Sequence, residues 1–203
     1  NKGVLLEVSH DSTHRIYIIK MTAKDNRFNP KFCESLDSAL SFILSNVSEY
    51  PSHKHALIVT GSGKFFSNGL DLTYLMSTPD PNQFLITHYE PLIFRFLTLG
   101  IPSIAFINGH AFAGGMCLAL AQDFRIAPSQ AKALLSMNEL LIRASIPAGM
   151  LAVLRSKLPT PQILRECIYA RRWTIKEAIT DGIIDGTCDS LEEAINFARI
   201  KAV

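Results

Sequence analysis

Three short, mostly apolar runs constrain the fold of this chain more than any other feature of its sequence. They are Arg15 to Lys20, Ala56 to Thr60 and Ser103 to Ile107, and turn residues bound the last two. Continuous apolar runs of strand length are typical of strands buried on both faces of a parallel sheet. Helical patterns separate these runs, so we expect an α/β fold built from βαβ units with right-handed crossovers.

Two helices are predicted between these strands. Asn29 and Pro30 supply an N-cap followed by a proline in the first helical turn, and apolar residues then recur at helical spacing. The recurring residues are Leu36, Leu40, Ile43 and Val47, so one face of this helix is expected to pack against the sheet. The segment from Pro81 to Leu99 is predicted to be the second helix.

The pattern changes after about Pro147, where we expect helices only. Leu151 to Leu158 and Pro161 to Ala170 are two of them, and the sequences Thr174 to Glu177 and Ser190 to Glu193 match capping boxes that begin two more. The sequence contains no internal repeat and no linker. We therefore expect a single domain over residues 1–203, with an α/β core over about 1–150 and a helical segment over about 151–203.

Composition limits the classes of partner. The 203 residues include 20 Lys and Arg against 18 Asp and Glu, a formal net charge of +2, and the basic residues are scattered. No strong field attracts nucleic acid or anionic lipid, although anionic small molecules remain possible. Four widely spaced cysteines, Cys33, Cys117, Cys167 and Cys188, indicate reduced thiols in an intracellular compartment rather than disulfides.

The stretch between Arg95 and Asp123 lacks charged side chains and is long enough to span a bilayer. Pro102, the turn around Gly109 and the pair Gly114-Gly115 interrupt it, so we expect a buried strand, a tight turn and a buried helix rather than a membrane span. The chain starts without Met and stops inside an expected helix, so we expect it to be a fragment, and targeting signals cannot be read from it.

Three simple motifs are excluded or weak. Thr60 to Lys64 resembles a phosphate loop, but Phe65 follows where that loop needs Ser or Thr. His53 and His55 have no further metal ligand nearby and are expected to lie in a solvated turn, so no metal site is predicted. The nucleophile motif Gly-x-Ser-x-Gly is absent from the sequence.

Two glycine-containing loops are more informative. Phe66 to Leu72 and Asn108 to Gly115 each follow an expected buried strand and lead into a helix, and parallel sheets bind ligands at the carboxyl ends of their strands. Small residues let the backbone approach a ligand, and free amides at a helix start favour an anion or an oxyanion. For either loop alone, tight helix packing is the plainer interpretation; together they favour a site.

The residues of both loops resemble the crotonase, or enoyl-CoA hydratase/isomerase, superfamily. Gly63 to Leu72 and Ile107 to Asp123 look like its two signature blocks, and the resemblance extends over about residues 15–184. It implies a crotonase-like spiral of repeated ββα units followed by the C-terminal helical segment. It also implies that the backbone amides of Leu70 and Gly114 form an oxyanion hole for a CoA thioester carbonyl.

The same resemblance implies the other site residues. The CoA thioester is expected to lie along the first loop, largely on its backbone, with Asn138 either orienting the substrate or capping a turn. The residues concerned are Ser67, Asn68, Gly69, Leu70, Asp71, Leu72, Gly114 and Asn138. Lys24, Arg27 and Lys64 are candidates for the CoA phosphates, and the sequence does not choose among them.

Hydratases of this family carry two glutamates, and the position of the first is Cys117 here. The second position matches Glu139, the only charged residue between Lys132 and Arg143, a pattern similar to the monofunctional Δ3,Δ2-enoyl-CoA isomerases. Glu139 is therefore the expected catalytic residue, against the alternative of a surface glutamate. Cys117 is expected to fill the volume of the absent glutamate rather than act as a nucleophile.

The function implied by this resemblance is the isomerisation of 3-enoyl-CoA to trans-2-enoyl-CoA in the β-oxidation of unsaturated fatty acids. The alternatives are a non-catalytic acyl-CoA-binding scaffold, a dienoyl-CoA isomerase and an acyl-CoA hydrolase. No cofactor is expected beyond the CoA of the substrate. Members of the family usually form trimers, so the resemblance further implies a homotrimer. The analogy with fatty-acid oxidation implies the peroxisome or the mitochondrion.

Overall fold

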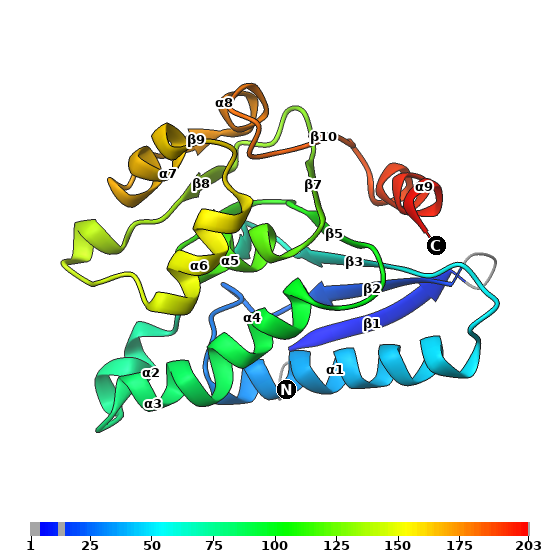
Figure 1. The fold of residues 1–203 in the computed structure, drawn as a ribbon, viewed down its shortest axis with the longest axis horizontal. Helices are drawn as coiled ribbons and strands as arrows, with labels where there is room; N and C mark the ends of the chain where they lie inside the picture. Colours follow the sequence, from blue (N-terminus) through cyan, green and yellow to red (C-terminus); the bar gives the residue numbers. More distant parts are fainter. Residues whose placement is uncertain (1–4, 12–14, 203) are drawn as a thin grey trace.

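A computed structural model describes residues 5–11 and 15–202 of the chain, so the outermost residues of the expected domain, 1–4 and 203, lie outside the described part. Its larger sheet has six strands in the order β1-β2-β3-β5-β7-β10 (Figure 1). The β1 and β2 strands are antiparallel, and the remaining neighbours are parallel. The strands are β1 (Leu6–Asp11), β2 (Ile16–Met21), β3 (Ala56–Gly61), β5 (Ser103–Phe106), β7 (Phe124–Ala127) and β10 (Gly186–Thr187).

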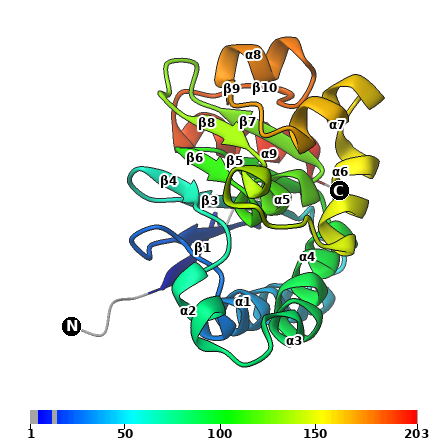
Figure 2. The ribbon, with the colours of Figure 1, turned by 90° about the vertical axis from the view of Figure 1, so that its left-hand side faces the viewer.

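A second sheet of four short strands lies beside the first, in the order β4-β6-β8-β9 (Figure 2). They are β4 (Phe65–Ser67), β6 (His110–Phe112), β8 (Leu134–Ser136) and β9 (Trp173–Thr174), with β8 and β9 antiparallel and the others parallel. The pairs β3-β4, β5-β6 and β7-β8 each give one strand to the large sheet and one to the small sheet. This repeated ββ unit confirms the crotonase-like spiral.

Helices cover both faces of the large sheet. Alternate side chains of β2 face opposite ways: Tyr17 and Ile19 join the main core, whereas Ile16 and Ile18 pack in a second core that includes Ala194. Burial on both faces explains why the strands read as continuous apolar runs. The helices are α1 (Pro30–Glu49), α2 (Leu72–Ser77), α3 (Pro81–Phe84), α4 (Glu90–Leu97), α5 (Gly114–Ala121), α6 (Ala148–Lys157), α7 (Pro161–Ile168), α8 (Ile175–Thr180) and α9 (Leu191–Lys201).

The two helices predicted in the first half are present. Asn29 caps α1 by accepting a hydrogen bond from the Phe32 amide, as its position before Pro30 predicts. The segment predicted as a helix from Pro81 to Leu99 is helical from Pro81 to Leu97, but its middle part, η1 (Leu85–Tyr89), is a π-helix rather than an α-helix.

The expectation of helices only after Pro147 is wrong, because β9 and β10 add one strand to each sheet. Each strand has two residues, too few to produce a recognisable sequence pattern. Thr174 forms the complete predicted capping box with Glu177. Ser190 accepts from the Glu193 amide, but the Glu193 carboxylate accepts from Asp189 instead of Ser190, so the second box is only half formed.

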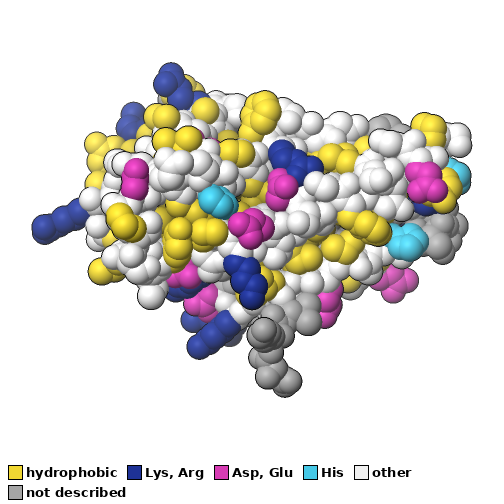
Figure 3. All heavy atoms as spheres, turned by 90° about the horizontal axis from the view of Figure 1, so that it is seen from below, with side chains coloured by type: hydrophobic (Ala, Val, Ile, Leu, Met, Phe, Trp, Pro, Cys, Tyr) yellow, Lys and Arg dark blue, Asp and Glu magenta, His cyan; other side chains and the backbone are white. Residues whose placement is uncertain are grey.

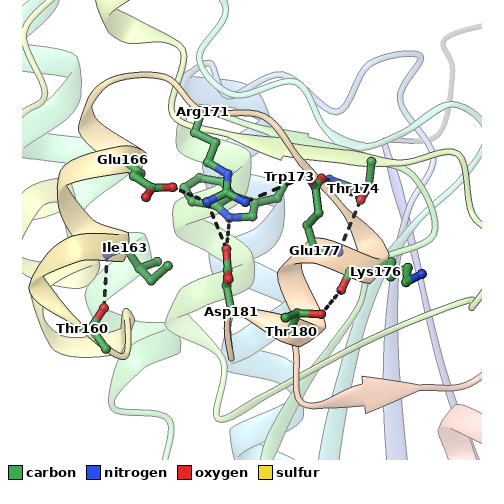
Figure 4. A network of polar contacts seen from close by, with 10 residues as sticks. All are labelled: Thr160, Ile163, Glu166, Arg171, Trp173, Thr174, Lys176, Glu177, Thr180 and Asp181. Carbon is green, nitrogen blue, oxygen red and sulfur yellow. Dashed lines mark hydrogen bonds and ion pairs between the residues drawn. The ribbon is translucent and has the colours of Figure 1, made fainter.

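A half-buried polar cluster joins α7, β9 and α8 (Figure 4). Arg171 forms ion pairs with Glu166 and Asp181, and its guanidinium lies 5.0 Å from the centre of the Trp173 ring. The indole of Trp173 also donates to Asp181 at 2.8 Å. These contacts fix β9, which in turn pairs with β8, the strand that leads to Asn138 and Glu139.

The expectation that His53 and His55 both lie in a solvated turn is correct for His53 and wrong for His55. His53 is exposed, but His55 is buried, with its Nε2 2.8 Å from the Tyr50 carbonyl oxygen and its ring stacked on Tyr17. Among the described residues no group of three His, Cys, Asp or Glu is placed to hold a metal ion.

The surface seen from below mixes Lys and Arg with Asp and Glu between hydrophobic side chains (Figure 3). The four cysteines are buried as free thiols. The uncharged stretch from Arg95 to Asp123 forms β5, β6 and α5, the expected strand, turn and helix. Across the described part of the chain, every helix is too short or too polar to cross a bilayer.

Candidate active site

The first glycine loop leaves β4 at Ser67 and enters α2 at Leu72. The buried Ser67 hydroxyl donates to the Asn26 carbonyl at 2.6 Å and accepts from the Gly69 amide. The Asp71 carboxylate caps α2 through the Tyr74 amide and accepts from the Asn29 side chain. The side chains of Ser67 and Asp71 therefore hold the loop in shape.

Backbone pairing with Phe28 orients Leu70. The Phe28 amide donates to the Gly69 carbonyl, and the Asp71 amide donates to the Phe28 carbonyl, each at 2.8 Å. In a parallel bridge of this kind, the residue between the two bonds directs its own amide away from the partner strand. The Leu70 N–H therefore points away from Phe28.

The second glycine loop leads from β6 into α5. Ala113 has a positive φ of 52°, and its amide donates to the Ser136 carbonyl at 2.9 Å. Gly114 is the first residue of α5, so its amide has no acceptor within the helix. The whole of α5 is buried, as the uncharged sequence predicts.

The two loops touch, and glycine permits the contact. A Cβ built on Gly69 would lie 2.8 Å from the Phe112 carbonyl oxygen and 3.1 Å from the Gly114 nitrogen. A Cβ on Gly115 would lie 2.3 Å from the Ser67 carbonyl oxygen. The structure thus brings the segment of Leu70 against the start of α5, where Gly114 lies.

Glu139 lies at the start of a short 3-10 helix, η2 (Glu139–Ile142), which follows β8. Its side chain is buried, at 7% exposure, and its Oε2 atom has no hydrogen-bond partner. Burial raises the pKa of Glu139 above its ordinary value because desolvation disfavours the carboxylate. The alternative of a surface glutamate is therefore wrong.

A cavity of about 310 Å³ brings several of the predicted residues together. Asn68, Leu70, Leu72, Asn138 and Glu139 line it, whereas Ser67, Gly69, Asp71 and Gly114 do not. Glu139 is the one carboxylate among its described lining residues. Arg27, a candidate for the CoA phosphates, and Ala113 of the second glycine loop also line it, and the lining residues that the sequence did not indicate are Leu75, Leu85, Ile142, Ala144, Ser145, Pro147 and Met150.

Two of the three basic candidates lie together. A hollow of about 300 Å³ is lined by Lys24, Arg27 and Lys31, and Arg27 also lines the cavity of Glu139. Lys64 lines neither hollow and lies over the Phe65 ring. Arg27 thus lies at the boundary between the two hollows, where its Nε atom donates to the Asp25 carboxylate at 3.2 Å.

Cys117 is fully buried in α5, and burial raises its pKa well above the ordinary value of a thiol. A nucleophilic cysteine needs a lowered pKa, so this environment disfavours that role. His110, the nearest histidine in sequence, accepts from the Leu134 amide through Nδ1 and stacks on Phe112.

A larger groove of about 630 Å³ lies between α4 and α6 and is lined mainly by apolar residues. Its acidic residue, Glu90, accepts a hydrogen bond from the Gly149 amide near the start of α6. Met150 lines both this groove and the cavity of Glu139. The smaller cavity is the stronger candidate because it places a buried carboxylate, with Oε2 free of hydrogen bonds, beside Leu70 and Ala113.

Comparison with known proteins agrees with this geometry. The family model described as enoyl-CoA hydratase/isomerase matches residues 12–199. The chain is 33% identical to the peroxisomal enoyl-CoA delta isomerase 1 of Arabidopsis thaliana over 192 residues, which cover 94% of this chain and 78% of the relative. It is 29% identical to the peroxisomal enoyl-CoA delta isomerase 2 of the same plant, covering 92% and 79%.

Solved structures share the fold. A probable enoyl-CoA hydratase of Mycobacterium tuberculosis superposes with a TM-score of 0.85 at 25% identity, covering 98% of this chain and 82% of that one. The crotonase-like spiral, the two glycine loops and the matching family model lead to one conclusion: the chain belongs to the enoyl-CoA hydratase/isomerase family.

Proposed function

We propose that this protein moves the double bond of a 3-enoyl-CoA, cis or trans, to give trans-2-enoyl-CoA during the β-oxidation of unsaturated fatty acids. The observation that carries this proposal is the buried carboxylate of Glu139, whose Oε2 atom has no hydrogen-bond partner, in a cavity that it shares with Leu70 and Ala113. The names of the Arabidopsis relatives, which are enoyl-CoA delta isomerases, support the same reaction.

Glu139 acts as a single base in this reaction. Its carboxylate removes a proton from C2, which gives a dienolate, and the resulting carboxylic acid returns the proton at C4. The raised pKa of Glu139 brings proton uptake and release closer to balance at the working pH. The less exposed apolar residues around the cavity, such as Leu85 and Met150, limit exchange of that proton with water.

The amides of Leu70 and Gly114 form the oxyanion hole in this proposal. Negative charge develops on the thioester oxygen only as the dienolate forms, so fixed amides stabilise the transition state more than the substrate. Loss of one such donor costs roughly 3 to 4 kcal/mol in other enzymes. The close contact of Gly69 with the Gly114 nitrogen supports the convergence of these amides.

The CoA part of the substrate lies along residues Ser67 to Leu72 and beside Asn138. Because the Ser67 and Asp71 side chains hold the loop, this contact is largely with the backbone. Lys24 and Arg27 are placed to meet the phosphates, since they share one hollow. The reaction transfers only a proton, so it requires no cofactor.

Hydration is disfavoured because water addition uses a second carboxylate. The buried thiol of Cys117 occupies the position of that group, and Glu139 is the one acidic residue among the described residues around the cavity. Dienoyl-CoA isomerisation and acyl-CoA hydrolysis likewise draw on further acidic groups in this family. A non-catalytic scaffold would have no use for a buried carboxylate with one oxygen free of hydrogen bonds, which costs folding free energy.

The test is an assay with 3-enoyl-CoA on the wild type and on Glu139→Gln, following formation of the conjugated 2-enoyl thioester. Conversion by the wild type that is lost in the variant supports the proposal. Binding of the thioester without conversion by the wild type would favour the scaffold instead. Parallel assays with 2-enoyl-CoA, dienoyl-CoA and saturated acyl-CoA test hydration, dienoyl isomerisation and hydrolysis.

The assembly and location belong to the same proposal. We propose a single-domain subunit that forms a homotrimer and acts in the peroxisome or the mitochondrion. Both Arabidopsis relatives are peroxisomal by name, which favours the peroxisome. Light scattering would measure the number of subunits, and imaging of the full-length protein would give its compartment.

A further inference from the structure

The helical segment from Pro81 to Leu97 contains one widened turn. In η1 the Glu90 amide donates to the Leu85 carbonyl, five residues back, as in a π-helix. One extra residue turns everything that follows by about 100° relative to a continuous α-helix. The buried positions show this step: Phe84 and Tyr89 are five apart, whereas Tyr89, Leu92 and Phe96 keep helical spacing. Turns of this kind are frequent at functional sites.

The widened turn directs Tyr89 onto the start of α5. Tyr89 is fully buried, and its hydroxyl donates to the Gly114 carbonyl at 2.8 Å. A Cβ on Gly114 would lie 2.8 Å from that hydroxyl oxygen, so the phenol occupies the space next to the glycine. Burial raises the pKa of Tyr89 well above its ordinary value, so the hydroxyl keeps its proton and remains a donor.

The ring of Tyr89 contacts the other glycine loop through Phe28. The two rings meet edge to face, with centroids 5.0 Å apart. The backbone of Phe28 holds both neighbours of Leu70, through the Gly69 carbonyl and the Asp71 amide. One side chain therefore braces both residues whose amides form the proposed oxyanion hole.

We propose that Tyr89 is a positioning residue for the oxyanion hole, fixing Gly114 through its hydroxyl and Leu70 through the Phe28 ring. Tyr89 is not among the described residues that line the cavity of Glu139, so it acts through these two neighbours rather than on the substrate. The inference rests on the proposed isomerase function.

The first test is Tyr89→Phe, which keeps the ring and removes the hydroxyl that donates to the Gly114 carbonyl and also contacts the Cys117 thiol. We expect kcat for 3-enoyl-CoA to fall roughly fivefold to tenfold, the equivalent of one hydrogen bond. KM should change little, because the CoA contacts are untouched. Tyr17→Phe is the matched control: Tyr17 is buried, its hydroxyl has no hydrogen-bond partner, and its removal should leave kcat unchanged.

A second variant, Phe28→Leu, removes the ring contact and leaves the Tyr89 hydroxyl in place. We expect a smaller fall in kcat, again at nearly constant KM. In both variants, acetoacetyl-CoA should bind with a smaller fraction in its enolate form, seen as weaker ultraviolet enolate absorbance, because that form depends on the oxyanion hole. A purely structural role would lower the melting temperature without changing this absorbance.

The outcomes separate the two proposals. Wild-type protein that neither isomerises 3-enoyl-CoA nor binds acetoacetyl-CoA as its enolate overturns the proposed function, and the role of Tyr89 with it. Active wild type with unchanged kcat and enolate absorbance in Tyr89→Phe overturns the role of Tyr89 alone.

Discussion

Replacing Glu139 by Gln tests the central residue of the proposed mechanism. The variant keeps the size and polarity of a side chain that is only 7% exposed, and removes its ability to take a proton. A well-placed acid or base contributes roughly 10² to 10⁴ in rate. Glu139 would serve in both proton transfers, so we expect a fall in kcat near 10⁴, or about 5 kcal/mol.

The same substitution has a predictable effect on stability. Burial raises the pKa of Glu139 in the folded state above its ordinary value of about 4.3. At pH values between the ordinary and the raised pKa, the folded protein therefore binds more protons than the unfolded chain. The free energy of unfolding therefore falls as pH rises through this window and is level above it. Gln is never charged, so Glu139→Gln should be more stable than the wild type at neutral pH, with no such advantage below about pH 4.

The assay follows the conjugated thioester product from 3-enoyl-CoA, together with urea unfolding at acid and neutral pH. The exposed Glu192 provides the control, because Glu192→Gln changes the same charge without altering a buried site. The reasoning is refuted if Glu139→Gln keeps more than about a tenth of wild-type kcat, or if its stability follows pH as the wild type does.

Three further perturbations test the geometry. Gly69→Ala should reduce kcat about tenfold or more, because its Cβ would force the two glycine loops apart. Gly63→Ala has a similar φ of 73° but open space around it, so it should cost only backbone strain of about 1 kcal/mol. Equal activities of the two variants would contradict this expectation. Glu90→Ala should lower the free energy of unfolding, measured in urea, by about 1 kcal/mol or more, because it leaves the Gly149 amide unpaired. Glu90→Gln retains an acceptor for that amide, so it should keep most of the wild-type free energy of unfolding. Arg27→Ala should raise KM for the CoA thioester severalfold, and more so at low salt, whereas Lys64→Ala should not. A larger increase in KM for Lys64→Ala than for Arg27→Ala would show that the CoA phosphates do not bind at Arg27.

The sequence predicts the parts of the fold whose physical signal is strong. The runs that became β2, β3 and β5 are largely buried on both faces, so most of their residues are apolar, and exceptions such as Lys20 and Thr60 lie near strand ends. Asn29 before Pro30 marks the start of α1 because its side chain completes the first turn. The strands of the small sheet have no local pattern, since strands of two or three residues are too short to show alternation, and only the family resemblance implies a second strand in each repeated unit.

The candidate site divides in the same way. The glycine loops and Glu139 could be located because each has an unusual sequence pattern. The second loop contains a run of small residues, and Glu139 is a single charged residue in an apolar segment. Leu85 and Met150 could not, since apolar side chains that line a cavity resemble those of the core. His55 is buried partly by its stacking on Tyr17 of the strand β2, and this contact between distant residues leaves no pattern in the local sequence.

The pairing of β8 with β9 has a consequence for the order in which the enzyme matures. Both glycine loops precede Asn138, yet the strand that leads to Glu139 is completed by Trp173 and Thr174. During synthesis, a nascent polypeptide emerging from the ribosome would thus carry both glycine loops well before the strand that pairs with β8. Among the parts that shape the proposed active site, this supporting strand is therefore translated last.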